Sequence, residues 1–151
     1  MTEFQIDLGS QDAANRFHDL DAFTRAYIEA MLWLARDWGH TDEYGGPDEY
    51  PDWTFEDLAP ETLGKIIADC TAFRAANAAE LEQAGDDEQN GHDFWLNRNQ
   101  HGTGFEDRGY PDAIWEALFE ASCGWRECDL CMRNDGKLYL LSSDDAYEAT
   151  T

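Results

Sequence analysis

Basic residues are scarce in this sequence. Lys and Arg together number 10, against 33 Asp and Glu, so the formal net charge is −23 over 151 residues. Broad binding to DNA or RNA requires clustered Lys and Arg that neutralise phosphates, and binding to an anionic membrane surface requires the same kind of charge. The composition therefore excludes both of these classes, and we expect no direct nucleic-acid binding.

Long apolar runs are also absent. No stretch approaches the ~20 apolar residues that a membrane-spanning helix needs. The first residues, MTEFQIDLGSQD, have neither the basic start nor the apolar stretch of a secretory signal peptide. We therefore expect a cytoplasmic protein that makes no membrane contact, in which the four cysteines are reduced thiols and do not form a disulfide framework.

Aromatic residues, in contrast, are abundant. The chain is 42% hydrophobic and 13% aromatic, with six Trp, whereas disordered chains contain few aromatic residues. A length of 151 residues suits one domain with a sizeable core. We expect residues 1–151 to form a single acidic globular domain, with a frayed tail from about residue 142.

Apolar spacing predicts the secondary structure. Apolar side chains recur every three or four residues in three segments, which indicates helices over 21–38, 60–84 and 111–123. HDFWL at 92–96 is expected to be a strand, and the flanking segments 85–91 and 97–109 are expected to be loops. Asp135-Gly136 supplies the tight turn of a hairpin made by 128–133 and 137–141. This order predicts an α+β fold with about three helices packed on a small antiparallel sheet.

Acidic residues gather in two stretches that contain no Lys or Arg, one between Arg36 and Lys65 and one between Arg74 and Arg98. Duplex DNA presents phosphates at ~3.4 Å intervals along each strand, so a folded surface bearing regularly spaced carboxylates can imitate it. Such a surface would occupy the Lys/Arg groove of a DNA-binding protein, with Tyr44, Tyr50 and Trp53 adding contacts beside the charges. The predicted partner-binding residues are Asp42, Glu43, Asp48, Glu49, Asp52, Trp53, Glu56, Asp57, Glu61, Glu80, Glu82, Asp86, Asp87 and Glu88.

Two alternatives to mimicry remain open for the acidic surface. A salt-loving host would favour many carboxylates on any surface protein. Ordinary solubility needs a net charge of only about 2 to 8 in magnitude for a small domain, which −23 far exceeds. A homodimer would extend an acidic face to match a longer duplex.

The cysteines raise the hypothesis of a metal centre. Cys123, Cys128 and Cys131 have the C-x4-C-x2-C spacing of a plant-type iron–sulfur site, with Cys70 as a fourth ligand. They could instead share a zinc ion with His92 or His101. The bulky GWRE between the first two cysteines argues against a cluster loop, and the predicted strand places Cys128 and Cys131 as packing residues. We therefore expect no metal ion and no cofactor.

A second polar group lies in residues 92–108. His92, Asp93, Arg98, His101, Asp107 and Arg108 fall within 17 residues. A His–Asp pair can perform acid–base chemistry and the arginines can hold an anion, so a small hydrolytic or metal-binding enzyme is the alternative function. No nucleophile or H-E-x-x-H motif accompanies them. We expect that Asp–Arg pairs hold the Gly-rich loop in place, and that the protein has no catalytic residues and is not an enzyme.

One long motif carries a family resemblance. HDFWLNRNQHGTGFEDRG, at 92–109, resembles the stretch HDFWLTRNGHGAGFWDRG of a widespread group of small, uncharacterised phage and plasmid proteins. In that group a helix and a DDGKLYL-like hairpin follow, and NDGKLYL at 134–140 occupies the same place here. This chain departs from the motif at Asn97, Gln100, Thr103 and Glu106, and only Glu106, in place of an aromatic residue, changes its character.

The resemblance covers about the C-terminal 60 residues and implies a mobile-element origin. Small acidic proteins that mimic DNA are a known phage device against restriction enzymes and CRISPR effector complexes. The resemblance therefore implies that the partner is a host DNA-binding defence protein, either a nuclease or a CRISPR effector subunit. It implies an anti-CRISPR or antirestriction inhibitor that acts in the host cytoplasm.

Overall fold

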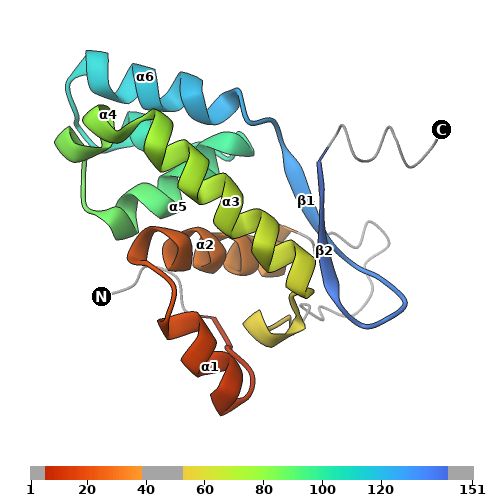
Figure 1. Ribbon diagram of the computed structural model, residues 1–151. Helices are drawn as coiled ribbons and strands as arrows, with labels where there is room; N and C mark the ends of the chain where they lie inside the picture. The colour runs from red at the N-terminus through yellow and green to blue at the C-terminus, as the bar shows by residue number, and fades with distance from the viewer. Residues whose placement is uncertain (1–5, 39–52, 143–151) are drawn as a thin grey trace.

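The computed structural model describes residues 6–38 and 53–142 and is mostly helical (Figure 1). Within these ranges the chain forms six α-helices, two short 3-10 helices and one two-stranded sheet. None of these helices is long and apolar enough to cross a membrane. The elements are α1 (Gln11–His18), α2 (Ala22–Trp38), η1 (Phe55–Asp57), α3 (Pro60–Ala76), α4 (Ala78–Gln83), α5 (Asp87–Arg98), η2 (Phe105–Asp107), α6 (Asp112–Cys123), β1 (Cys128–Met132) and β2 (Leu138–Ser142).

Helix α2 is the centre of the core, as its apolar spacing predicts. It crosses the middle of the molecule, with α1 on one side and α3 and α5 on the other (Figure 1). Phe23, Tyr27 and Met31 are fully buried on it. The predicted cap is confirmed, because Oδ1 of Asp21 accepts a hydrogen bond from the backbone N of Thr24 at 2.8 Å. A helix buried on several faces in this way positions its neighbours around it.

The predicted α+β fold of about three helices on a small sheet is wrong, chiefly because of α5. The segment expected to contain a loop at 85–91 and a strand at 92–96 is one helix, capped by Asp86, whose Oδ1 accepts from Gln89 N at 2.8 Å. Every residue from Asn90 to Arg98 is buried. A helix buried all round has no apolar stripe with a period of 3.6 residues, so its sequence resembles that of a short buried strand.

Two further differences concern the helices. The predicted helix over 60–84 is broken at Asn77, whose backbone leaves the helical region (φ −125°, ψ 25°), so the segment forms α3 and α4. Helix α1 was not predicted from the apolar pattern; Ser10 caps it by accepting from Ala13 N at 3.2 Å. Before α1, residues 6–8 form an extended arm along η1, where Phe55 N donates to Asp7 O and Glu56 N to Leu8 O.

The predicted hairpin is confirmed. Strands β1 and β2 are antiparallel, with Leu130 opposite Leu140, and Gly136 in the turn has the positive φ (78°) that the Asp-Gly pair predicts. The hairpin lies at one end of the helical body (Figure 1). It is fixed there by Leu138 O, which accepts from Ala59 N at 3.1 Å and from Thr62 Oγ1 at 2.8 Å. The sheet is thus an attachment to α3 and does not form a layer under the helices.

Helices α2 and α5 make the most extensive contact between elements, and Gly91 permits it. A Cβ at Gly91 would lie 2.1 Å from Phe23 O and 2.9 Å from Ala26 Cβ. We expect Gly91→Ala to lower the free energy of unfolding by about 1–3 kcal/mol through overpacking, although alanine favours helix by about 1 kcal/mol. Urea unfolding measures this change.

Gly64 in α3 is the matched control, since a Cβ there would meet nothing within 4 Å. We expect Gly64→Ala to raise the free energy of unfolding by about 0.5–1 kcal/mol, because only helix propensity changes. If both substitutions stabilise the protein, the close crossing of α2 and α5 at Gly91 is incorrect.

Candidate functional site

The motif at 92–109 folds as the second half of α5 and a loop that turns back on it. Oδ1 of Asn97 accepts from Phe105 N at 2.9 Å, and its Nδ2 donates to Oε1 of Glu106 at 3.0 Å. Asn97 and Glu106 are two of the positions that depart from the resembled motif, and here they bond to each other. Oδ1 of Asn99 accepts from Cys128 N at 2.8 Å, which joins the helix end to β1. Most polar residues of the motif therefore have structural partners.

Asp93 and Arg108 hold the same loop, as the sequence predicts. Asp93 is fully buried, and Nη2 and Nε of Arg108 donate to its carboxylate at 2.8 and 3.2 Å. Burial raises the pKa of Asp93, while the hydrogen bonds and charge of Arg108 oppose that rise. The pair is thus an internal clamp across the loop.

Arg98, considered above as an anion-holding residue, is a core residue. Its side chain is 2% exposed. Nη1 donates to Asp69 Oδ2 at 2.9 Å and to the Tyr27 hydroxyl at 3.2 Å, and Nε donates to Arg126 O at 2.8 Å. Burial raises the pKa of Tyr27 well above its usual value, so this hydroxyl stays protonated. Arg98 serves to join α2, α3 and α5, and is not available to a ligand.

The histidines and cysteines are not brought together as a metal site. His92 and His101 are nine residues apart, with His92 near the start of α5 and His101 beyond its end, a separation of about 13 Å along the axis. Cys70 and Cys128 are buried, whereas Cys123 and Cys131 are half-buried. In the part of the chain that the structure describes, the cysteines belong to no group of candidate metal ligands.

Burial makes two of the thiols unreactive. It raises the pKa of Cys70 and of Cys128, and each pKa unit lowers the thiolate fraction about tenfold at neutral pH. We expect iodoacetamide to alkylate Cys131 at least about tenfold faster than Cys70 or Cys128 in the native protein. Peptide mass spectrometry after timed labelling measures the rates; equal rates without denaturant would contradict the buried positions.

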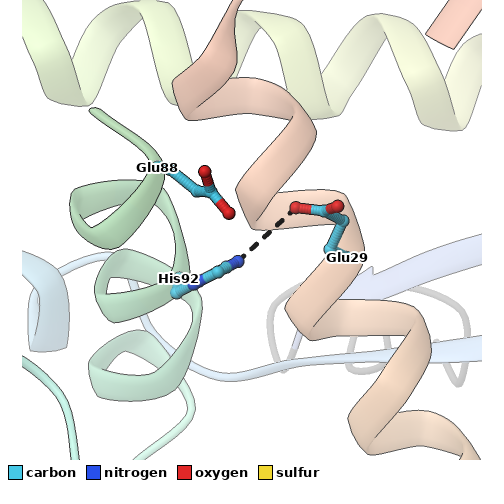
Figure 2. A group of neighbouring side chains, drawn as sticks. All are labelled: Glu29, Glu88 and His92. Carbon is cyan, nitrogen blue, oxygen red and sulfur yellow. Dashed lines mark ion pairs between the residues drawn. The ribbon is translucent and has the colours of Figure 1, made fainter. Parts of the chain in front are cut away.

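A different group of side chains does converge, on the faces where α2 meets α5. Glu29, Glu88 and His92 point toward one another (Figure 2), with one candidate ligand atom from each lying within 4.8 Å of the others. Nε2 of His92 lies 3.5 Å from Oε1 of Glu29. Glu29 and Glu88 also line a pocket of about 280 Å³. These three residues are the candidate ligands for a metal ion among the described residues.

Sequence reasoning considered His92 but missed both glutamates as its partners. Glu29 is a charged residue between the fully buried Ile28 and Ala30, which is a signal that the sequence contains. Glu88 and His92 have the i,i+4 spacing that places side chains on one helix face, but this spacing has no meaning while 92–96 is treated as a strand.

The predicted partner-binding acids form two separate groups. Asp42, Glu43, Asp48, Glu49 and Asp52 lie outside the described residues, as do Tyr44 and Tyr50. One group, which we name the α3 acidic start, comprises Glu56, Asp57 and Glu61. The other, the α4–α5 acidic end, comprises Glu80, Glu82, Asp86, Asp87 and Glu88. Helix α3 separates them (Figure 1), and its 17 residues correspond to about 25 Å.

Several of these residues also have local structural roles. Glu56 accepts a hydrogen bond from Ser10, and Asp57 accepts from Thr54 N at 2.9 Å. Asp86 caps α5, and Trp53 is half-buried against the core. Glu61 and Glu82 are exposed. The acidic surface is therefore made in part of residues that also fix helix ends.

Many of the few cations are paired with carboxylates of the protein itself. The ion pairs join Arg16 to Asp12, Lys65 and Arg98 to Asp69, Arg74 to Asp21 and Asp87, and Arg108 to Asp93. Pairing leaves the net charge unchanged but neutralises points of positive potential. The outer surface therefore presents mainly carboxylates.

Comparisons of this chain with protein-family models, with curated proteins and with solved structures found no match.

Proposed function

We propose that this protein is an acidic inhibitor from a phage or another mobile element, which occupies the nucleic-acid groove of a host defence protein. The partner would be a nuclease or a subunit of a CRISPR effector complex. The observation that carries the proposal is the α4–α5 acidic end. Five carboxylates lie within nine residues there, and Arg74 is ion-paired to one of them, Asp87.

The distance between the two acidic groups fits one nucleic-acid groove. About 25 Å along α3 corresponds to roughly seven phosphate intervals of 3.4 Å. A basic groove that binds one ~34 Å turn of duplex is long enough to contact both groups at once. A rigid helix between the groups also keeps their spacing fixed, which lowers the entropy that binding would cost.

Electrostatics favour fast association with such a groove. A charge of −23 generates a long-range negative potential, which steers a basic partner toward the protein. The Debye length is about 8 Å at physiological ionic strength, so we expect the affinity to fall steeply as salt rises. The proposed activity is binding alone, with no chemical step.

Capture from host lysate followed by elution with duplex DNA tests the proposal. The tagged protein would be incubated with nuclease-treated lysate, washed at about 0.15 M salt, and challenged with duplex DNA or with an uncharged polymer. We expect a DNA-binding defence protein to elute with duplex alone. A partner that stays bound in excess duplex, or elution by both polymers alike, would overturn the proposal.

The salt dependence of folding separates this proposal from the halophile alternative. A protein adapted to molar salt gains tens of degrees in melting temperature between low and molar salt, whereas an inhibitor that acts in an ordinary cytoplasm must already be folded at low salt. Circular dichroism during heating, at both salt concentrations, distinguishes the two.

A further inference from the structure

We infer that Glu29, Glu88 and His92 bind one divalent transition-metal ion between α2 and α5. The candidate ligand atoms, two carboxylate oxygens and one imidazole nitrogen, all lie within 4.8 Å of one another. Figure 2 shows both carboxylates directed toward the imidazole, Glu88 from the same helix as His92 and Glu29 from the facing helix. This site is independent of the acidic groove-binding surface and does not rest on the proposed inhibitor function.

The separation of the two nearest atoms suits a shared ion. Nε2 of His92 and Oε1 of Glu29 are 3.5 Å apart, which is longer than the 2.7–3.2 Å typical of N–H···O hydrogen bonds. Two ligands bound to one tetrahedral ion at about 2.0–2.1 Å are about 3.3 Å apart. Shifts of a few tenths of an ångström would therefore bring both atoms into metal-bonding positions.

The backbone holds these ligands in place without the ion. Glu88 and His92 are one turn apart on α5, on the same face of that helix. Glu29 is fixed opposite them because α2 and α5 cross closely at Gly91. The imidazole is 3% exposed and the Glu29 side chain 14%. Two carboxylates in so dry a position repel each other, and a bound cation would offset that repulsion.

The ligand types indicate the class of ion. Calcium and magnesium prefer sites made of oxygen alone, whereas imidazole together with carboxylate suits zinc, iron and related ions. Three protein ligands leave at least one coordination position open. Because Glu29 and Glu88 line the 280 Å³ pocket that Arg25 and His18 also line, we place the open position on the pocket side, where a water molecule or a small anion would bind.

Equilibrium dialysis against Zn²⁺, with metal analysis of the protein, tests the inference. Excess Mg²⁺ and about 0.15 M salt would suppress loose binding to surface carboxylates. We expect one zinc ion per chain, and an affinity at least about tenfold lower in Glu88→Gln and in Glu29→Gln, because each loses one ligand. The control Glu82→Gln, which removes the same charge from an exposed position on α4, should bind zinc as the unmodified protein does.

Two further measurements keep the result unambiguous. Each variant would be unfolded in urea to show that it is folded, and the absorption of bound Co²⁺ would report whether thiolates are ligands. We expect a Co²⁺ spectrum without thiolate charge transfer, and a rise in melting temperature with Zn²⁺ that Glu88→Gln abolishes. Absence of stoichiometric zinc, equal affinity in Glu88→Gln and Glu82→Gln, or thiolate bands in the Co²⁺ spectrum would each overturn the site. None of these outcomes bears on capture of a DNA-binding partner.

Discussion

Replacing Arg98 by methionine is expected to lower the free energy of unfolding by about 3–5 kcal/mol, enough to unfold a marginally stable domain. Arg98 donates to Asp69 at 2.9 Å and to Arg126 O at 2.8 Å from a position that is almost fully buried. Methionine fills a similar volume but leaves the Asp69 carboxylate, which is 7% exposed, without this partner. Urea unfolding followed by circular dichroism measures the loss.

Two variants show whether the loss comes from the buried charge. Arg16→Met breaks the exposed pair with Asp12 at 3.2 Å and should cost less than about 1 kcal/mol. The double variant Arg98→Met/Asp69→Leu should be more stable than Arg98→Met, because both buried charges are then absent. A loss below about 1 kcal/mol in Arg98→Met, or no recovery in the double variant, would contradict this account of the core.

Reversing two charges at the α4–α5 acidic end should weaken binding to the DNA-binding partner by about 100-fold. The variant Glu80→Lys/Glu82→Lys converts two carboxylates that would face Lys or Arg into cations that repel them. Close charge pairs across a protein interface contribute about 1.5 kcal/mol or more each, and 1.4 kcal/mol corresponds to a factor of ten in affinity. Surface plasmon resonance against the captured partner gives the affinity and the association rate.

The matched control is Asp12→Lys/Asp19→Lys, which makes the same change in net charge on exposed residues of α1 and the turn after it. If overall charge alone drives binding, the two variants lose affinity equally. If the α4–α5 acidic end is the contact, the control changes mainly the association rate and loses far less affinity. Equal losses would remove the assignment of this surface.

Local patterns in the sequence predicted the parts of the fold that local patterns determine. The apolar spacing around Phe23, Tyr27 and Met31 predicts α2, and Asp135-Gly136 predicts the hairpin turn. Both depend on contacts near in sequence, and both are confirmed. The break at Asn77 could not be predicted in this way, since apolar residues continue through it.

Helix α5 shows why the rest could not be predicted. Its buried face carries polar residues such as Asp93, Asn97 and Arg98, whose partners come from distant elements, including Asp69 and Arg108. A polar residue reads as exposed until its partner is known. The same reason hid the candidate metal site, because Glu29 lies 63 positions before His92 and only the packing of α2 on α5 brings them together.

Competition with duplex DNA tests the proposed function most directly. A fluorescent duplex would be bound to the purified partner, and this protein would be titrated in while the anisotropy of the duplex is followed. The proposal predicts that the anisotropy falls to the value of free duplex, and that Glu80→Lys/Glu82→Lys fails to lower it at the same concentration. An anisotropy that stays at or above that of the complex, with the protein bound beside the duplex, would contradict occupation of the nucleic-acid groove.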